Sequence, residues 1–219
     1  MDNPKLRARN RQHICRDPAK VTRFPRTTRR QERIEAVLRH RQPDLSVVLE
    51  NVHDPHNVGA VLRSCDAVGV MHVHTVYSIE ERPHAAYAQS SSGGARKWIN
   101  VTHHESADTC FQILAAQGLS ILAASLNDDS QTLYDLDLTR PMALVFGNEN
   151  RGVSDEFLAR AEVTVAIPMM GMVESLNISV ACAVSLYEAM RQRQAAGMYE
   201  QSRLSETERA ALGEDWLTR

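Results

Sequence analysis

Short apolar runs alternate with helical patterns along most of this chain, and that alternation constrains its fold more than any other feature. The apolar runs have the length of buried strands and predict strands over residues 45–49, 72–76, 98–101, 120–124, 143–146 and 163–167. Elsewhere, apolar residues recur every three or four positions and predict helices over residues 58–68, 107–117, 155–161 and 176–194. Such alternation is typical of an α/β domain, so we expect a mostly parallel sheet flanked by helices.

Charge divides the 219 residues into a basic beginning and an acidic remainder. Residues 1–42 contain 13 Lys and Arg against 4 Asp and Glu, whereas the rest contains 12 against 23. A basic segment of this kind favours a polyanionic partner, RNA or DNA, over the plainer alternatives of a solubilising tail or a targeting sequence.

We divide the chain into four parts by composition and pattern. They are a basic arm expected to be disordered, a short amphipathic helix, the α/β domain, and a short polar tail with one or two helical turns near residues 206–212. Their bounds are residues 1–27, 28–42, 43–196 and 197–219.

Several classes of protein lack support in this sequence. The chain has no apolar run of about 18 residues, so we expect no membrane-spanning helix. Its four cysteines form no Cys-x-x-Cys pair, which favours reduced thiols and a cytoplasmic protein. Its nine histidines show no metal-ligand spacing, so we expect no metal site. Walker A, GxGxxG and GxSxG patterns are absent, which leaves nucleoside-triphosphate, dinucleotide and serine-hydrolase chemistry without support.

Two polar segments lie where an expected strand ends and a helix begins. In residues 51–63, Asn57 is a candidate N-cap and Arg63 follows almost two turns later. In residues 143–154, Gly147 would let the backbone approach a ligand closely. Because the carboxyl ends of parallel strands line ligand crevices, both segments are candidate site elements. A capped helix or an ordinary turn is the structural alternative for each.

A third segment, residues 165–180, is apolar and rich in methionine around Gly171 before it turns polar. Mobile methionines beside a glycine suit an adaptable apolar pocket, such as one for an adenine ring. Ser175 and Asn177 lie at the expected helix start. N-capping explains Ser175 well, but it explains the whole polar set less well.

Taken together, the three segments resemble the three motifs of the SpoU/TrmH branch of the SPOUT RNA methyltransferases. They occur in the family's order: Asn57 to Arg63, then Phe146-Gly-Asn-Glu-Asn-Arg-Gly152, then Ile167-Pro-Met and Ser175-Leu-Asn-Ile-Ser179. The resemblance extends over about residues 29–199. Three ordered motifs make it specific.

The resemblance implies 2′-O-methylation of a tRNA ribose, with guanosine 18 in the D-loop as the address and S-adenosylmethionine as the methyl donor. It also implies a deep trefoil knot near the C-terminus and a homodimer with active sites at the subunit interface. The implied catalytic positions are the polar residues of the motifs: Arg63, Asn57, Glu149, Ser175 and Asn177. The implied donor-binding positions follow three strands and precede a helix: Ala124, Gly147, Ile167 and Leu176. Because the donor's methyl group is already activated, no metal is expected.

Two other readings stay open at this point. The chain could methylate rRNA or another tRNA nucleotide, or it could be a non-catalytic RNA-binding protein with the same fold. The presence of all five motif polar residues favours an enzyme. The tail after Tyr199 is short and acidic, whereas family members often carry a longer basic extension there. We therefore expect the basic arm to contribute to tRNA binding.

Overall fold

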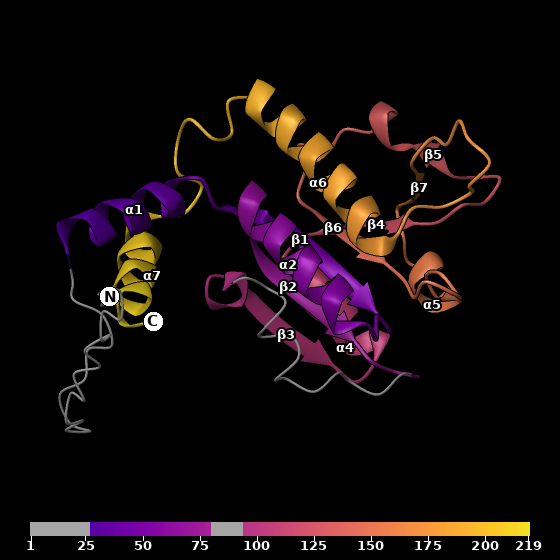
Figure 1. Ribbon diagram of the computed structural model, residues 1–219, viewed down its shortest axis with the longest axis horizontal. Coiled ribbons are helices and arrows are strands. Elements are labelled where there is room, and N and C mark those ends of the chain that lie inside the picture. The colour runs from indigo at the N-terminus through magenta and orange to yellow at the C-terminus, as the bar shows by residue number, and fades with distance from the viewer. Residues whose placement is uncertain (1–26, 80–93) are drawn as a thin grey trace, which may run out of the picture.

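The computed structural model describes residues 27–79 and 94–219. Its strands are β1 (Gln42–Glu50), β2 (Val70–Val76), β3 (Asn100–His104), β4 (Ser120–Ala124), β5 (Gln131–Thr132), β6 (Met142–Phe146) and β7 (Val163–Ala166). They form one sheet in the order β3-β2-β1-β6-β4-β7-β5, with every neighbouring pair parallel (Figure 1). The predicted α/β fold is confirmed. β5 has no predicted counterpart, because two residues are too few to show a pattern.

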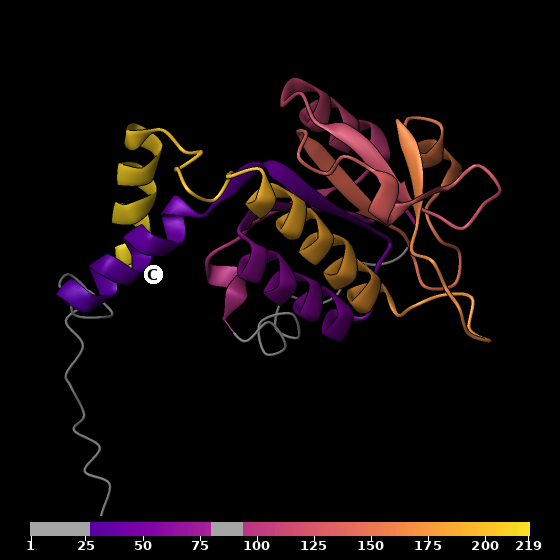
Figure 2. The same ribbon diagram turned by 90° about the horizontal axis from the view of Figure 1, so that it is seen from above.

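Helices cover both faces of the sheet. They are α1 (Thr28–Arg39), α2 (Pro55–Val68), α4 (Ala107–Ala116), α5 (Asp155–Leu158), α6 (Ile178–Ala195) and α7 (Glu206–Thr218), with 3-10 turns η1 (Ala95–Lys97) and η2 (Leu133–Asp135). α2 and α6 lie side by side on one face, and α4 and α5 cover the other (Figure 2). Burial on both faces explains why the strands read as nearly continuous apolar runs. Across residues 27–79 and 94–219, no helix is both long and apolar enough to cross a bilayer.

α1 and α7 come from opposite ends of the chain and pack against each other beside the sheet domain (Figures 1 and 2). Ile34 and Leu38 of α1 share a buried apolar cluster with Trp216 of α7. The one or two helical turns expected near residues 206–212 are part of a longer helix, because α7 has 13 residues. Its apolar residues form no clear stripe, so the sequence pattern is weak. Contact with α1 and a capping box between Ser205 and Glu208 stabilise it instead.

The first described residue, Thr27, caps α1. Its side-chain oxygen accepts a hydrogen bond from the Arg30 amide at 3.3 Å. The rest of the expected basic arm lies outside the described residues. α1 ends at Arg39, and β1 begins three residues later at Gln42.

α6 is held at its C-terminal end by Arg193, whose side chain is fully buried. The Arg193 guanidinium donates to the carbonyls of Leu138 (3.0 Å) and Arg140 (2.8 Å). It also donates to the Asp44 carboxylate at 2.7 Å. These bonds join the end of α6 to β1 and to the segment before β6. The other end of the helix is therefore directed toward the carboxyl ends of the strands.

Candidate active site

Three of the predicted catalytic residues meet through side-chain hydrogen bonds at the carboxyl edge of the sheet. Asn57 of α2 donates from Nδ2 to Glu149 Oε1 at 2.7 Å. Asn177, at the start of α6, donates from Nδ2 to Asn57 Oδ1 at 3.1 Å. Asn57 therefore links two residues that lie 92 and 120 positions away from it in the sequence. We call this set the Asn57 bridge.

The cap of α2 is not the predicted one, and the difference frees Asn57 for its bridge. α2 begins at Pro55, and its N-cap is Asp54, whose Oδ1 accepts the His56 amide at 2.8 Å. Aspartate is a strong cap, and proline suits the first helical position because it needs no amide hydrogen there. Asn57 therefore lies inside the first turn, and the predicted capping role for it is wrong.

The cap of α6 is Asn177 and not Ser175. Asn177 Oδ1 accepts the Ser179 amide at 2.9 Å, so the same side chain caps α6 and donates to Asn57. Ser175 lies in the exposed loop before the helix. The interpretation that capping explains Ser175 is wrong, and its hydroxyl is left facing solvent.

The loop after β6 depends on a very close approach between two stretches of its own backbone. A Cβ at Gly147 would lie 2.0 Å from the Gly152 carbonyl carbon and oxygen and 2.2 Å from the Val153 nitrogen. Asn148 and Gly152 pair through two backbone hydrogen bonds of 3.0 and 2.8 Å. The absent side chain at Gly147 thus makes room for the chain itself. The turn that results presents Glu149 to Asn57.

Asn148 fixes this turn from within. Its side chain is nearly buried, and Nδ2 donates to the Asn51 carbonyl at 2.9 Å. Its Oδ1 accepts the amides of Asn150 (2.9 Å) and Arg151 (3.3 Å). Asn148 therefore orders the residues on both sides of Glu149 and ties them to the end of β1. Nothing in the sequence pattern marks Asn148 apart from its neighbours in the motif.

Asn51 is a second residue that the sequence reasoning missed. It has φ of 53°, in the left-handed region where asparagine is tolerated better than most residues. Its amide donates to the Val76 carbonyl at 2.8 Å, and its Oδ1 accepts the amides of Ser78 and Ile79, both at 3.1 Å. Asn51 thus joins the ends of β1 and β2. An asparagine just after a buried strand was the available signal.

Arg63 is not part of the Asn57 bridge. It lies six residues further along α2, which turns its side chain about 120° away from Asn57 around the helix axis. Its side chain is exposed, and it forms no hydrogen bond or ion pair with a residue of the described chain. Any group that Arg63 contacts through its guanidinium therefore lies outside the described residues of this chain.

The four predicted donor-binding positions gather around adjacent strands. Ala124 ends β4, Gly147 follows β6 and Ile167 follows β7, and these three strands are neighbours in the sheet. Ala124 and Ile167 are half-buried and pack against the core beneath α2 and α6. Leu176 directly precedes the cap of α6. Backbone groups from several segments therefore line one short edge.

The methionine-rich segment differs from the predicted apolar pocket. Met170 is 95% exposed and Met172 is completely exposed. Both side chains belong to the loop between β7 and α6 and are open to solvent in the described part of the chain. Val173 in the same loop is also largely exposed.

This combination of a parallel sheet and a polar bridge at its carboxyl edge has counterparts among known proteins. The chain matches the model of the SpoU rRNA Methylase family over residues 44–187. It belongs to this family, and so to a class of methyl-transferring enzymes. The family expected from the sequence motifs is confirmed.

Particular relatives narrow the comparison. The chain is 46% identical over 192 residues to the tRNA (guanosine(18)-2′-O)-methyltransferase of Thermus thermophilus, covering 88% of this chain and 97% of the relative. The A. aeolicus TrmH/SpoU tRNA modifying enzyme superposes with a TM-score of 0.78 at 35% identity, covering 86% of this chain and 95% of the other. An AdoMet-bound rRNA methyltransferase from Sinorhizobium meliloti superposes with a TM-score of 0.63 at 25% identity, covering 72% and 59%.

Gly147→Ala is expected to destabilise the fold by about 1–3 kcal/mol, because its Cβ overlaps the backbone at Gly152. Chemical denaturation measures this change. Gly171→Ala is the matched control, since nothing lies within 4 Å of its added Cβ, and it should change stability by less than about 1 kcal/mol. Equal stabilities for the two variants would contradict the close approach.

Proposed function

We propose that this chain transfers a methyl group from S-adenosylmethionine to the ribose 2′-hydroxyl of guanosine 18 in tRNA. The observation that carries the proposal is the Asn57 bridge, which joins all three motif segments in one hydrogen-bonded set. The name of the Thermus thermophilus relative supports the same reaction and address, since the identity extends over 88% of this chain.

The carboxyl edge of β4, β6 and β7 fits the methyl donor. Ala124, Gly147 and Ile167 would hold it through backbone groups, with Leu176 closing the site from the start of α6. The half-buried Ala124 and Ile167 side chains offer apolar surface for an adenine ring. The AdoMet-bound Sinorhizobium meliloti structure supports this choice of donor. When bound, S-adenosylmethionine supplies a methyl group already activated by a positively charged sulfur.

The difficult step is at the ribose hydroxyl, which is weakly acidic and must lose its proton as its oxygen attacks. Arginine stays protonated in proteins and is a poor base, so we do not assign proton removal to Arg63. Arg63 acts through its charge: it orients a substrate phosphate that accepts the proton, or it stabilises the negative charge that develops on the oxygen. Its exposure and lack of a partner within the described chain leave it available for that contact.

The Asn57 bridge positions the other groups. Asn57 holds Glu149 and the start of α6 in one arrangement, so little reorganisation is needed when the ribose meets the donor. Ser175 lies exposed two residues before Asn177, where its free hydroxyl can contact substrate. Asn57, Glu149 and Asn177 are thus positioning residues, and Arg63 and Ser175 face the RNA.

Arg63 would reach its substrate at the interface of a homodimer. α6 leaves Val180 46% exposed and Tyr187 50% exposed, seven residues apart on one side of the helix. These apolar side chains suit a second copy packed against α6 and α2. Sedimentation equilibrium at the enzyme concentration of the assay is expected to give twice the chain mass of 24.5 kDa. A purely monomeric protein that is fully active would contradict the dimer.

Transfer of a tritiated methyl group to unmodified tRNA transcripts tests the function. Label is expected at the ribose of nucleotide 18, located by nuclease mapping, and it should disappear when guanosine 18 is replaced. Label on rRNA alone, or at another tRNA nucleotide, would support methyl transfer to RNA but contradict guanosine 18 as the target nucleotide. Absence of both methyl transfer and donor binding would favour the RNA-binding alternative.

Arg63→Lys keeps the positive charge but loses the planar fork of donors. Turnover is expected to fall by about 100-fold, the cost typical of removing one group that stabilises developing charge. Binding of S-adenosylmethionine, measured by calorimetry, should stay unchanged. Arg160→Lys, at an exposed arginine on the α5 side of the sheet, is the matched control and should keep wild-type turnover. Near wild-type turnover in Arg63→Lys would refute the assignment.

A further inference from the structure

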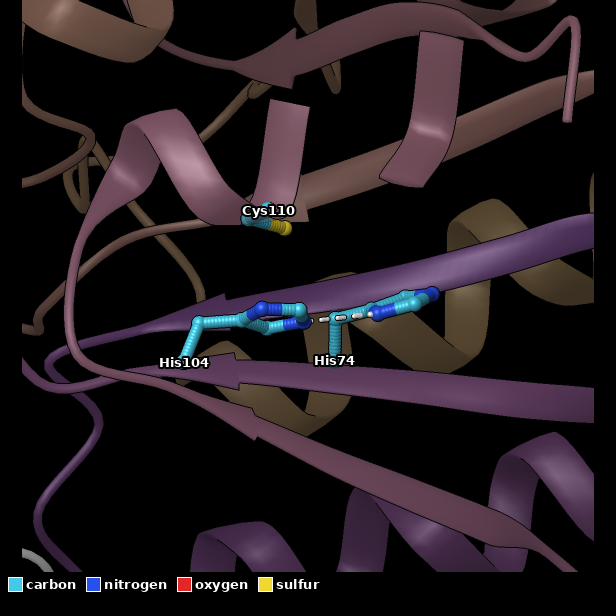
Figure 3. Close-up of side chains that lie close together, drawn as sticks. All are labelled: His74, His104 and Cys110. Carbon is cyan, nitrogen blue, oxygen red and sulfur yellow. Dashed lines mark hydrogen bonds between the residues drawn. The ribbon is translucent and has the colours of Figure 1, made fainter. Parts of the chain in front are cut away.

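Three side chains with metal-ligand atoms gather outside the candidate active site, on the face of the sheet that α4 covers. His74 of β2 and His104 of β3 contribute imidazoles, and Cys110 contributes a thiol from the first turn of α4 (Figure 3). They are 2%, 6% and 0% exposed, respectively. One donor atom of each lies within 4.8 Å of the other two. We call this group the His–Cys cluster.

The two imidazoles are in direct contact but are not fully satisfied. His74 Nδ1 and His104 Nε2 lie 3.0 Å apart and share one hydrogen bond. The other ring nitrogen of His74, Nε2, is buried without a hydrogen-bond partner in the described chain. The histidine pair therefore has one hydrogen bond between its rings, through the two nitrogens that face each other.

Burial keeps both histidines in the form that binds metals. Loss of solvent lowers the pKa of His74 to about 4, with the nearby His104 and His72 adding to the effect. Burial lowers the pKa of His104 as well. Both rings are therefore neutral near pH 7, and metal binding requires no proton to be removed from an imidazolium.

We propose that His74, His104 and Cys110 form a three-ligand Zn²⁺ site that ties α4 to strands β2 and β3, with water as the fourth ligand. Imidazole nitrogen and cysteine sulfur are the common ligands of tetrahedral zinc, with Zn–N bonds of about 2.0–2.1 Å and Zn–S bonds of about 2.3 Å. Tetrahedral angles place two zinc-bound nitrogens about 3.3 Å apart. His74 Nδ1 and His104 Nε2, now 3.0 Å apart, would have to separate only slightly.

The charges at this position can balance. Burial and the Glu50 carboxylate raise the pKa of Cys110 to about 12, so the free thiol keeps its proton. On binding, the S–H bond breaks, the sulfur keeps the electron pair and bonds the metal, and the proton leaves to solvent. The thiolate offsets one charge of the ion, and the electrostatic effect of Glu50 that opposes a thiolate here favours a cation.

The donor set also selects the metal. Mg²⁺ and Ca²⁺ require oxygen ligands, which this cluster lacks. The imidazole pair suits Zn²⁺ better than Cu⁺, which prefers sulfur donors. The site lies on the face opposite α2 and does not touch the Asn57 bridge, so it stands whether or not the proposed function holds.

The test uses the full chain without an affinity tag, stripped with a chelator and then titrated with Co²⁺ and with Zn²⁺. Wild type is expected to bind one equivalent of Co²⁺ with a thiolate-to-cobalt charge-transfer band, which Zn²⁺ abolishes by displacement. Cys110→Ala should lose the band and weaken Zn²⁺ binding at least about tenfold. Cys182→Ala is the matched control, because Cys182 is an equally buried free cysteine outside the cluster, and it should keep both properties.

A second measurement on wild type keeps the proposal testable if Cys110→Ala does not fold. One equivalent of Zn²⁺ should raise the thermal unfolding midpoint of the stripped protein by several degrees, because the ion binds the folded state alone. The proposal is overturned by the absence of the charge-transfer band or of this shift in wild type. Unchanged Zn²⁺ affinity in Cys110→Ala, or loss of the band in Cys182→Ala, would overturn it equally.

Discussion

The parallel direction of all neighbouring strands is the constraint on which the candidate active site depends. Parallel strands end at the same edge of a sheet, so the segments after β1, β4, β6 and β7 gather there although they are distant in the sequence. Helices bury both faces of the sheet, and the edge is where polar loops can remain in contact with solvent. The Asn57 bridge forms at this edge because three of those segments meet nowhere else.

Backbone contacts decide where the side chains of the bridge point. Gly147 allows the turn after β6 to fold back on Gly152, and Asn148 locks that turn against Asn51. Glu149 lies in this turn, between Asn148 and Gly152, and its side chain accepts a hydrogen bond from Asn57. The glycine therefore serves the site indirectly, through the shape of the turn. The close approach to a ligand that the sequence predicts for Gly147 would come in addition to this role.

The opposite face of the sheet brings three candidate metal ligands together without any sequence motif. His74 and His104 lie 30 residues apart, and β2 and β3 pair with Val76 opposite His104 and His74 opposite Thr102. The two histidines therefore lie diagonally on neighbouring strands, and α4 adds Cys110 above them. The expectation of no metal site rested on spacing along the chain. Spacing along the chain cannot register ligands that come from separate strands.

Sequence patterns by themselves determined the α/β class, because apolar runs and helical periodicity follow directly from which surfaces are buried. They also identified the three motif segments and hence the family. Tertiary structure decided the rest. It made Asp54 and Asn177 the caps, and it left Asn57 free to join Asn177 to Glu149. It also ordered α7, whose apolar residues form no stripe, by packing it on α1. Such contacts depend on distances between remote residues, and local sequence does not encode those distances.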